Sequence, residues 1–181
     1  MDLDKGIVRI GDKEYFLNTT EFPTIDMNNP YELTMEEMFL MGRFRADFIN
    51  STVLERHINF LYDKGNIYKI HNGNLLFHGS IPLNEDGSLK EVQIYGKTYK
   101  GKELYDVLET YVRRAFFSVN GDEQRKGRDI MWYIWAAPNS PLFGKDKMTT
   151  FERYFIADKA THKETKNAYY HLLENEEVID N

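Results

Sequence analysis

The chain has 181 residues, in which 23 Lys and Arg stand against 29 Asp and Glu, so its net charge is −6. This acidic balance argues against a general nucleic-acid or membrane-surface role, because either role needs a basic face. Hydrophobic residues make up 41% of the chain, enough to bury the core of one domain, and the lack of cysteine excludes disulfides and thiol nucleophiles.

The N-terminal part begins without an apolar signal core in residues 1–5, and no window approaches the roughly 20 apolar residues of a membrane helix. We therefore expect a cytoplasmic protein. Apolar residues alternate over residues 6–17 around Gly11 and Asp12, which predicts a β-hairpin. Prolines and paired asparagines indicate a loop over residues 21–31.

Two helices are predicted next, each with a polar residue at its start. Thr34 with Glu37 three residues later has the pattern of a capping box, which opens a helix through about Phe48. Ser51 caps the second helix, whose apolar residues recur at helical spacing until Gly65 ends it in the C′ position.

A second hairpin carries the most informative residue of the chain. Residues 67–70 and 75–78 flank an Asn-Gly turn, so His78 lies at the end of a strand, and Gly79 follows it. Ligands of open α/β sheets bind at the carboxyl ends of strands, where His78 could be one ligand of a metal site. The residues alone leave open whether His78 binds a metal or only a backbone group.

The rest of the chain mixes further helices and strands without a regular βαβ rhythm. The run 130–137 holds both tryptophans; its period does not separate helix from strand, but we expect full burial in either case. The other predicted elements are a hairpin at 90–99, a helix at 102–118, a loop at 138–147, a short helix at 151–155 capped by Thr149 or Thr150, and a last helix from about Asn167. Residues 174–181 lack a C-cap, which indicates that the protein continues.

The loop 138–147 is the second candidate site, because two prolines and a glycine stiffen it. Lys145 and Lys147 in it, with Arg153 soon after, suit a phosphate, and Asn139 is a candidate sugar or phosphate contact. A rigid surface loop with solvated lysines is an equally good interpretation.

The four other histidines have simpler explanations. We expect His57 to be a core or boundary residue, because it falls on the apolar stripe of its helix. His71 lies at a hairpin tip and should be solvated, and we assign no role to His162 and His171.

Five segments carry a family resemblance: Trp132-Tyr-Ile-Trp135, residues 57–65, residues 74–87 with the Phe-His-Gly-Ser centre, residues 138–146 (Pro-Asn-Ser-Pro-Leu-Phe-Gly-Lys-Asp) and residues 151–156 (Phe-Glu-Arg-Tyr-Phe-Ile). They resemble the class III fructose-1,6-bisphosphatases of bacteria. The similarity runs essentially from end to end. That family consists of much longer enzymes, and this chain resembles their middle part.

The family is akin to the metallophosphoesterases, in which a strand ends in a His followed by Gly-Gly and that His binds one of two metals. His78 and Gly79 match this pattern, with Ser80 in place of the second glycine. The resemblance therefore implies His78 as a ligand of a divalent metal, which we expect to be manganese. One imidazole cannot hold a metal pair, and the other ligand motifs, of the types Asp-x-His, Gly-Asp-x-x-Asp-Arg-Gly, Gly-Asn-His-Asp and Gly-His, do not occur in this chain.

The implied fold is α+β, a segment of a metallophosphoesterase-type α/β sandwich with peripheral β-hairpins. We expect residues 1–181 to form one domain or a fragment of a larger catalytic domain. Within it, residues 1–31 form a hairpin and loop, residues 32–87 form helices and the hairpin that bears His78, and residues 88–181 form a hairpin, helices and the proline-rich loop.

The implied function is metal-dependent hydrolysis of fructose 1,6-bisphosphate to fructose 6-phosphate and phosphate in gluconeogenesis, with the chain inactive by itself. We expect no nucleic-acid or membrane partner, and we expect self-association to cover open strand edges. The alternatives are a non-catalytic regulatory or binding module of the same ancestry and a phosphatase of phosphoproteins.

Overall fold

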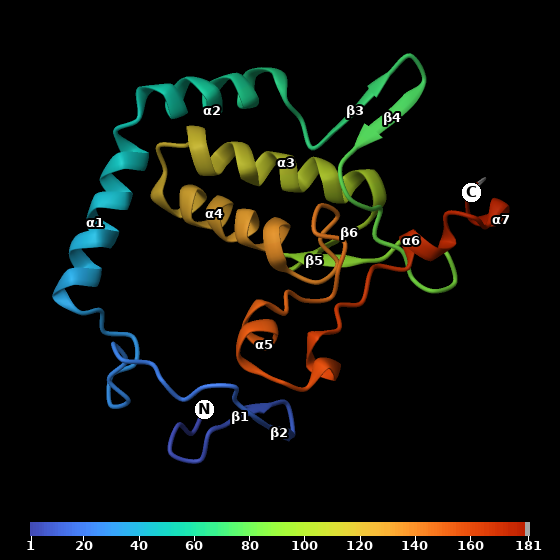
Figure 1. Cartoon of the computed structure of the whole chain (residues 1–181). Coiled ribbons are helices and arrows are strands. Elements are labelled where there is room, and N and C mark those ends of the chain that lie inside the picture. Colours follow the sequence, from blue (N-terminus) through green and yellow to red (C-terminus); the bar gives the residue numbers. More distant parts are fainter. Residues whose placement is uncertain (180–181) are drawn as a thin grey trace. The chain divides into compact units, whose positions relative to one another are not determined.

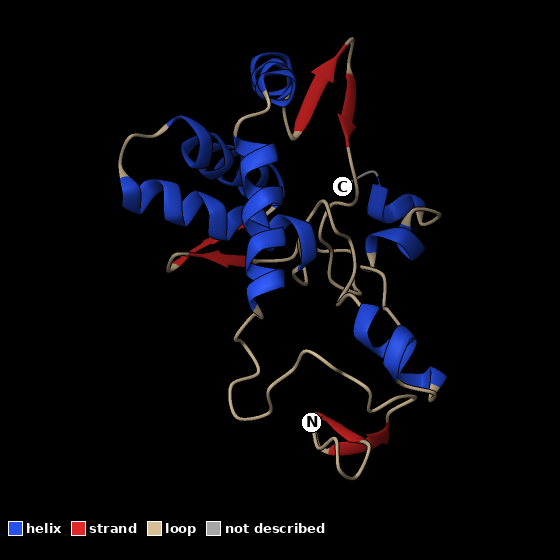
Figure 2. Cartoon of the chain, turned by 60° about the vertical axis from the view of Figure 1, so that its left-hand side comes forward, coloured by secondary structure: helices blue, strands red, loops and turns tan. Residues whose placement is uncertain are grey.

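Helices and short antiparallel hairpins build the chain, for which we describe residues 1–179 in a computed structural model (Figures 1 and 2). This mixture confirms the α+β class. In the described residues, no helix has the length and apolarity that crossing a membrane requires. The elements are β1 (Ile7–Ile10), β2 (Lys13–Phe16), α1 (Met35–Ile49), α2 (Thr52–Lys64), β3 (Tyr68–His71), β4 (Asn74–Phe77), β5 (Val92–Ile94), β6 (Lys97–Tyr99), α3 (Gly101–Phe117), α4 (Gly121–Ala136), α5 (Thr150–Phe155), a 3₁₀-helix (Lys159–His162), α6 (Tyr169–Leu172) and α7 (Glu176–Ile179).

The chain divides into two compact units. The first comprises residues 1–65 and 151–161, and the second comprises residues 66–150 with the C-terminal residues from His162 onward. The division at residues 31 and 87 that the sequence suggested stays a prediction.

The first unit joins its N-terminal hairpin to the helix α5. β1 and β2 pair in antiparallel register, which confirms the predicted hairpin, and the backbone N–H of Asn18 donates to the Phe155 carbonyl at 2.8 Å. Leu17 and Ile156 form a β-bridge, and only 1% of Ile156 is exposed. Residues far apart in the sequence therefore hold this unit together.

The starts of α1 and α2 are capped as predicted. The Thr34 hydroxyl accepts a hydrogen bond from the Glu37 N–H at 3.2 Å, while the Glu37 carboxylate accepts one from the Thr34 N–H at 2.8 Å. Ser51 caps α2 in the same way, through the Leu54 N–H. These bonds satisfy N–H groups that have no partner within a helix.

Two predictions about α2 are wrong. Gly65 is the C-cap itself, in an extended conformation (φ −90°, ψ 157°), and it does not adopt the left-handed conformation of a C′ glycine. His57 is exposed and not a core residue, and no other residue of α1 or α2 is buried. The apolar stripe indicated the less polar face of α2 but not whether that face is covered.

The core of the second unit lies where α3 and α4 pack side by side (Figure 1). Leu104 and Leu108 of α3 are fully buried against Ile130 and Ile134 of α4, and the hairpin β5–β6 adds Val92 and Ile94. The predicted helix at 102–118 and hairpin at 90–99 are confirmed.

The tryptophans do not belong to this core, although the sequence predicted full burial of residues 130–137. That run is the end of α4, where successive side chains point around the axis. Ile130 and Ile134, four residues apart, face α3, whereas 64% of Trp132 and 60% of Trp135 is exposed. The rings of the two tryptophans contact each other at 5.0 Å between centroids.

The prediction of one continuous last helix from about Asn167 is also wrong. The structure has two short helices there, α6 and α7, separated by residues 173–175. The side chain of Asn175 accepts a hydrogen bond from the Glu177 N–H, which competes with continued helix bonds. The predicted end of that helix at Asp180 and Asn181 lies outside the described residues.

Replacing Gly127 by Ala tests the close packing of α3 and α4. A Cβ atom on Gly127 would lie 2.5 Å from the Tyr111 carbonyl oxygen and 2.5 Å from the Ala115 nitrogen, both rigid backbone atoms. We expect Gly127→Ala to lower the free energy of unfolding by about 2 kcal/mol, measured by urea titration of tryptophan fluorescence from α4. Gly121→Ala is the control, since nothing lies within 4 Å of its Cβ position. Equal stability of the two variants would contradict the close approach.

Candidate functional site

His78 is positioned by the hairpin β3–β4, whose tip projects away from α3 and α4 (Figures 1 and 2). Asn72 and Gly73 both have positive φ (50° and 78°), so they form the tight turn that the sequence predicted. Tyr68 pairs with Phe77, and His78 follows as the first residue after β4. The strands are shifted by one residue from the predicted bounds, and the His78 side chain is exposed.

Gly79 brings the backbone after His78 directly against the loop 138–147. Its φ is 93°, and a Cβ atom there would lie 2.2 Å from the Pro141 carbonyl oxygen and 2.9 Å from the Leu142 Cα. The Ser80 N–H donates to the same Pro141 carbonyl at 2.7 Å. Only glycine allows this approach, so the two candidate sites of the sequence meet at one backbone contact, which we call the Gly79 contact.

Helix α3 supports the Ser80 side of the Gly79 contact through Tyr105. Ser80 is fully buried, and its carbonyl accepts a hydrogen bond from the Tyr105 hydroxyl at 3.0 Å. Burial raises the pKa of Tyr105, so the hydroxyl keeps its proton and remains a donor. The Tyr105 ring also meets Phe77 edge to face at 6.3 Å. The hydroxyl of Ser80 is buried without a hydrogen-bond partner among the described residues.

Helix α4 holds the other side, the loop 138–147, which the sequence correctly predicted. The Tyr133 hydroxyl donates to the Asn139 carbonyl at 2.9 Å. The Ser140 hydroxyl donates to the Ile134 carbonyl at 2.7 Å and accepts from the backbone of the following turn. The core helices thus fix both backbones that form the Gly79 contact.

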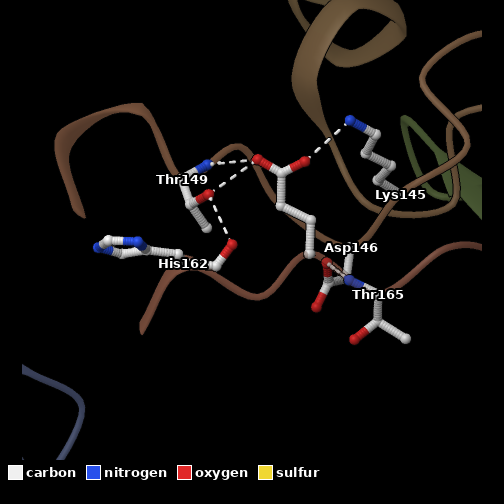
Figure 3. A network of polar contacts seen from close by, with 6 residues as sticks. Lys145, Asp146, Thr149, His162 and Thr165 are labelled. Atoms are coloured by element: carbon white, nitrogen blue, oxygen red, sulfur yellow. Dashed lines mark hydrogen bonds and ion pairs between the residues drawn. The ribbon is translucent and has the colours of Figure 1, made fainter. Parts of the chain in front are cut away.

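The same loop is joined to the C-terminal segment by strand-like pairing. Lys145 and Lys166 form a β-bridge, and the Asp146 N–H donates to the Thr165 carbonyl at 2.9 Å. The Asp146 carboxylate in turn accepts a hydrogen bond from the Thr165 N–H at 2.7 Å (Figure 3).

Glu164 neutralises one of the predicted phosphate ligands. Its carboxylate lies 2.8 Å from the Lys145 ammonium and accepts bonds from the N–H and hydroxyl of Thr149 at 3.0 and 2.8 Å (Figure 3). The bond from Lys145 is the main cause that lowers the pKa of Glu164 to about 2, followed by the bonds from Thr149. Thr149 directly precedes α5, and its hydroxyl also lies 3.2 Å from the His162 carbonyl; the cap expected at Thr149 or Thr150 stays a prediction.

A polar cavity of about 280 Å³ lies beside this loop. Three segments line it: residues 83–85 with Lys90, residues 138–139 with 145–146, and residues 165–168. The cavity brings together two residues predicted from the sequence, Asn139 and Lys145. Lys147 and Arg153 do not line it; Lys147 is exposed, and Arg153 belongs to α5 in the other unit. Lys90 and Lys166 were missed, because no local pattern distinguishes them from other lysines.

The described residues do not by themselves fit a metal pair. They include no group of three or more His, Asp or Glu side chains that could hold a metal ion. The His78 side chain is exposed, but one imidazole by itself cannot hold a metal pair. His71 is exposed as predicted, and His171 lies 2.9 Å from the Glu85 carboxylate.

Replacing Glu164 by Gln tests the network in Figure 3. Because the folded pKa of Glu164 is near 2 and its ordinary value is 4.5, its stabilising effect is complete above pH 4.5 and disappears as the pH falls to about 2. We expect the urea midpoint of the wild type to exceed that of Glu164→Gln at pH 7 and the two to converge near pH 2. Glu174→Gln removes an equal charge at an exposed position and serves as control. A pH-independent difference for Glu164→Gln would contradict this network.

Comparison with known proteins finds relatives that match this chain along nearly its whole length. A family model described as Firmicute fructose-1,6-bisphosphatase matches residues 1–181. The chain is 51% identical over 179 residues to the fructose-1,6-bisphosphatase class 3 of Clostridium botulinum (strain 657), covering 98% of this chain and 27% of that protein. The class 3 protein of Clostridium acetobutylicum is 48% identical over 182 residues, covering 100% of this chain and 27% of its own.

A fructose-1,6-bisphosphatase class 3 protein of Clostridium beijerinckii is 49% identical over 174 residues, covering 96% of this chain and 26% of that protein. No solved structure matches. The chain spans about 27% of the length of the first two relatives, which agrees with the predicted resemblance to one part of a longer enzyme. The chain therefore belongs to the Firmicute fructose-1,6-bisphosphatase family.

Proposed function

We propose that this chain is part of a metal-dependent phosphatase that hydrolyses fructose 1,6-bisphosphate to fructose 6-phosphate and phosphate, in the cytoplasm and in the direction of gluconeogenesis. The observation that carries the proposal is the identity of about 50% along nearly the whole chain to proteins named for this activity. The chain spans only about a quarter of those proteins, so the activity belongs to the longer protein.

His78 supplies one metal ligand in this proposal. Its support is its place directly after β4, its exposure, and the backbone contact at Gly79 that fixes its position. A bound pair of divalent ions, which we expect to be manganese, would activate a water and neutralise phosphoryl oxygens. In this proposal the remaining ligands come from other parts of the longer protein, because the described residues offer no group of three ligands, and this chain alone is inactive.

Substrate contacts are proposed for Asn139, Lys145, Lys147 and Arg153. Asn139 and Lys145 have the better support, because both line the polar cavity beside the loop 138–147. Lys145 already pairs with Glu164, so an incoming phosphate would share or compete for its ammonium group. Lys147 is an exposed cation in the same loop.

The proposed parent fold is a metallophosphoesterase-type sandwich in which the hairpin β3–β4 forms part of a sheet. The hairpin is suited to this role, since 63% of Ile70 and 54% of Leu76 is exposed and two strands alone are marginally stable. Further strands of the longer protein, or a second copy, would cover these side chains.

A non-catalytic regulatory or binding module is the second candidate. It is favoured by one observation, the lack of a group of three metal ligands among the described residues. Such a module would bind sugar phosphates without contributing a ligand to a metal.

Replacing His78 by Ala in the longer protein separates the two functions. With manganese present, we expect His78→Ala to reduce phosphate release from fructose 1,6-bisphosphate by at least about 100-fold, because one proposed metal ligand is lost. His71→Ala, at the exposed tip of the same hairpin, should keep the wild-type rate.

Metal content of the purified variants and their unfolding curves should be measured in the same experiment. A folded His78→Ala protein with wild-type turnover and metal content would rule out the ligand assignment and favour the non-catalytic module. The isolated chain, assayed under the same conditions, should release no phosphate.

A further inference from the structure

Lys90 is a half-buried lysine whose ammonium group pairs with no carboxylate in the part of the chain that the structure describes. Its backbone N–H donates to the Pro82 carbonyl at 2.9 Å, so the residue itself is held in place. Without a carboxylate beside it among the described residues, this ammonium group is free to pair with an anionic ligand. Lys90 lines the polar cavity and also a neighbouring cavity beside Glu91 and Lys100.

The lining of this cavity holds three lysines against two acidic residues, an excess of one positive charge. Lys90, Lys145 and Lys166 line it from three different segments. Each of the two acidic residues has a hydrogen-bond partner: Glu85 lies 2.9 Å from the His171 imidazole, and Asp146 accepts the Thr165 N–H. Lys145 pairs with Glu164 outside the lining, whereas the Lys166 ammonium lies 5.5 Å from the Tyr170 ring centre and meets no carboxylate among the described residues.

The cavity also offers a neutral group for hydroxyls. Asn139 has positive φ (61°), and its backbone carbonyl accepts the Tyr133 hydroxyl, which fixes the residue. No described residue bonds to its side-chain amide, so this amide can both donate to and accept from a sugar hydroxyl. Lysines beside an amide suit a phosphorylated sugar better than inorganic phosphate.

His78 does not line the cavity. We propose that the cavity binds the phosphate of a sugar bisphosphate that is not cleaved, with Lys90 as its main ligand, Lys166 as the second cation and Asn139 on the sugar. This inference rests on the proposed function for the identity of the substrate. In this inference the polar cavity recognises the phosphate that stays on the sugar, and the proposed site at His78 binds the phosphate that reacts. Binding energy from the remote phosphate would then distinguish a bisphosphate from a simple phosphate ester.

Titration of the chain with fructose 6-phosphate tests the inference without any metal or turnover. This probe carries only the phosphate that would not be cleaved, and binding can be followed by amide chemical shifts or calorimetry. We expect Lys90→Gln to weaken binding about tenfold and Lys166→Gln to weaken it less, since a charged hydrogen bond is lost. Lys97→Gln is the matched control, because Lys97 is exposed on β6 and lines no described cavity.

Inorganic phosphate and fructose serve as the other probes. Weaker binding of inorganic phosphate and no binding of fructose support a sugar-phosphate site. Wild-type affinity of a folded Lys90→Gln for fructose 6-phosphate, or shifts confined to residues outside the cavity, would overturn the inference, as would a wild-type chain that does not bind this probe.

Kinetics of the longer protein keep this inference separate from the proposed function. Lys90→Gln should raise KM for fructose 1,6-bisphosphate about tenfold while leaving the hydrolysis of a simple aryl phosphate unchanged. An active enzyme with an unchanged KM in this variant would refute the cavity assignment alone. A longer protein that does not hydrolyse the bisphosphate at all would refute the proposed function, and the binding titration would still decide the cavity.

Discussion

The approach of two backbones at Gly79 is the constraint on which the rest of this structure depends. The chain leaves β4 after Phe77, exposes His78, and then passes so close to Pro141 that no side chain fits at position 79. The hydrogen bond from the Ser80 N–H to the Pro141 carbonyl closes this contact at 2.7 Å. Main-chain atoms therefore join His78, a candidate metal ligand, to the loop that borders the polar cavity. Such atoms have few ways to move.

The core of the second unit makes the Gly79 contact rigid. Tyr105 of α3 donates to the Ser80 carbonyl, and Tyr133 at the end of α4 donates to the Asn139 carbonyl. The two helices are themselves held at close range, since Gly127 leaves no room for a Cβ against α3. The packed helices α3 and α4 thus hold a candidate site that is built on loops, and the pairing of Lys145 with Glu164 adds a charged bond at the far end of the loop.

Local features of this fold could be predicted from the sequence, whereas features that need a distant partner could not. The capping box at Thr34 and the Asn-Gly turn before His78 are set by residues at most three apart, so their patterns suffice. The exposure of Trp132 depends on which side of α4 meets α3, and the apolar run carries no such information. Lys90 reaches the cavity only after three separate segments come together, so no motif marks it. Resemblance to a family added what local patterns lacked, namely the expectation that His78 binds a metal rather than only a backbone group.

The most direct test of this account is the rate of fructose 1,6-bisphosphate hydrolysis by the longer protein with Gly79→Ala. The added Cβ would push the His78 backbone away from Pro141, and a displacement of about 1 Å near reacting groups can reduce the rate about 100-fold. Gly96→Ala is the matched control, because its φ of 80° is similarly strained but nothing lies within 4 Å of its Cβ position. The account predicts a folded Gly79→Ala protein with at least this loss and a Gly96→Ala protein of near-normal rate. A wild-type rate in Gly79→Ala would contradict it.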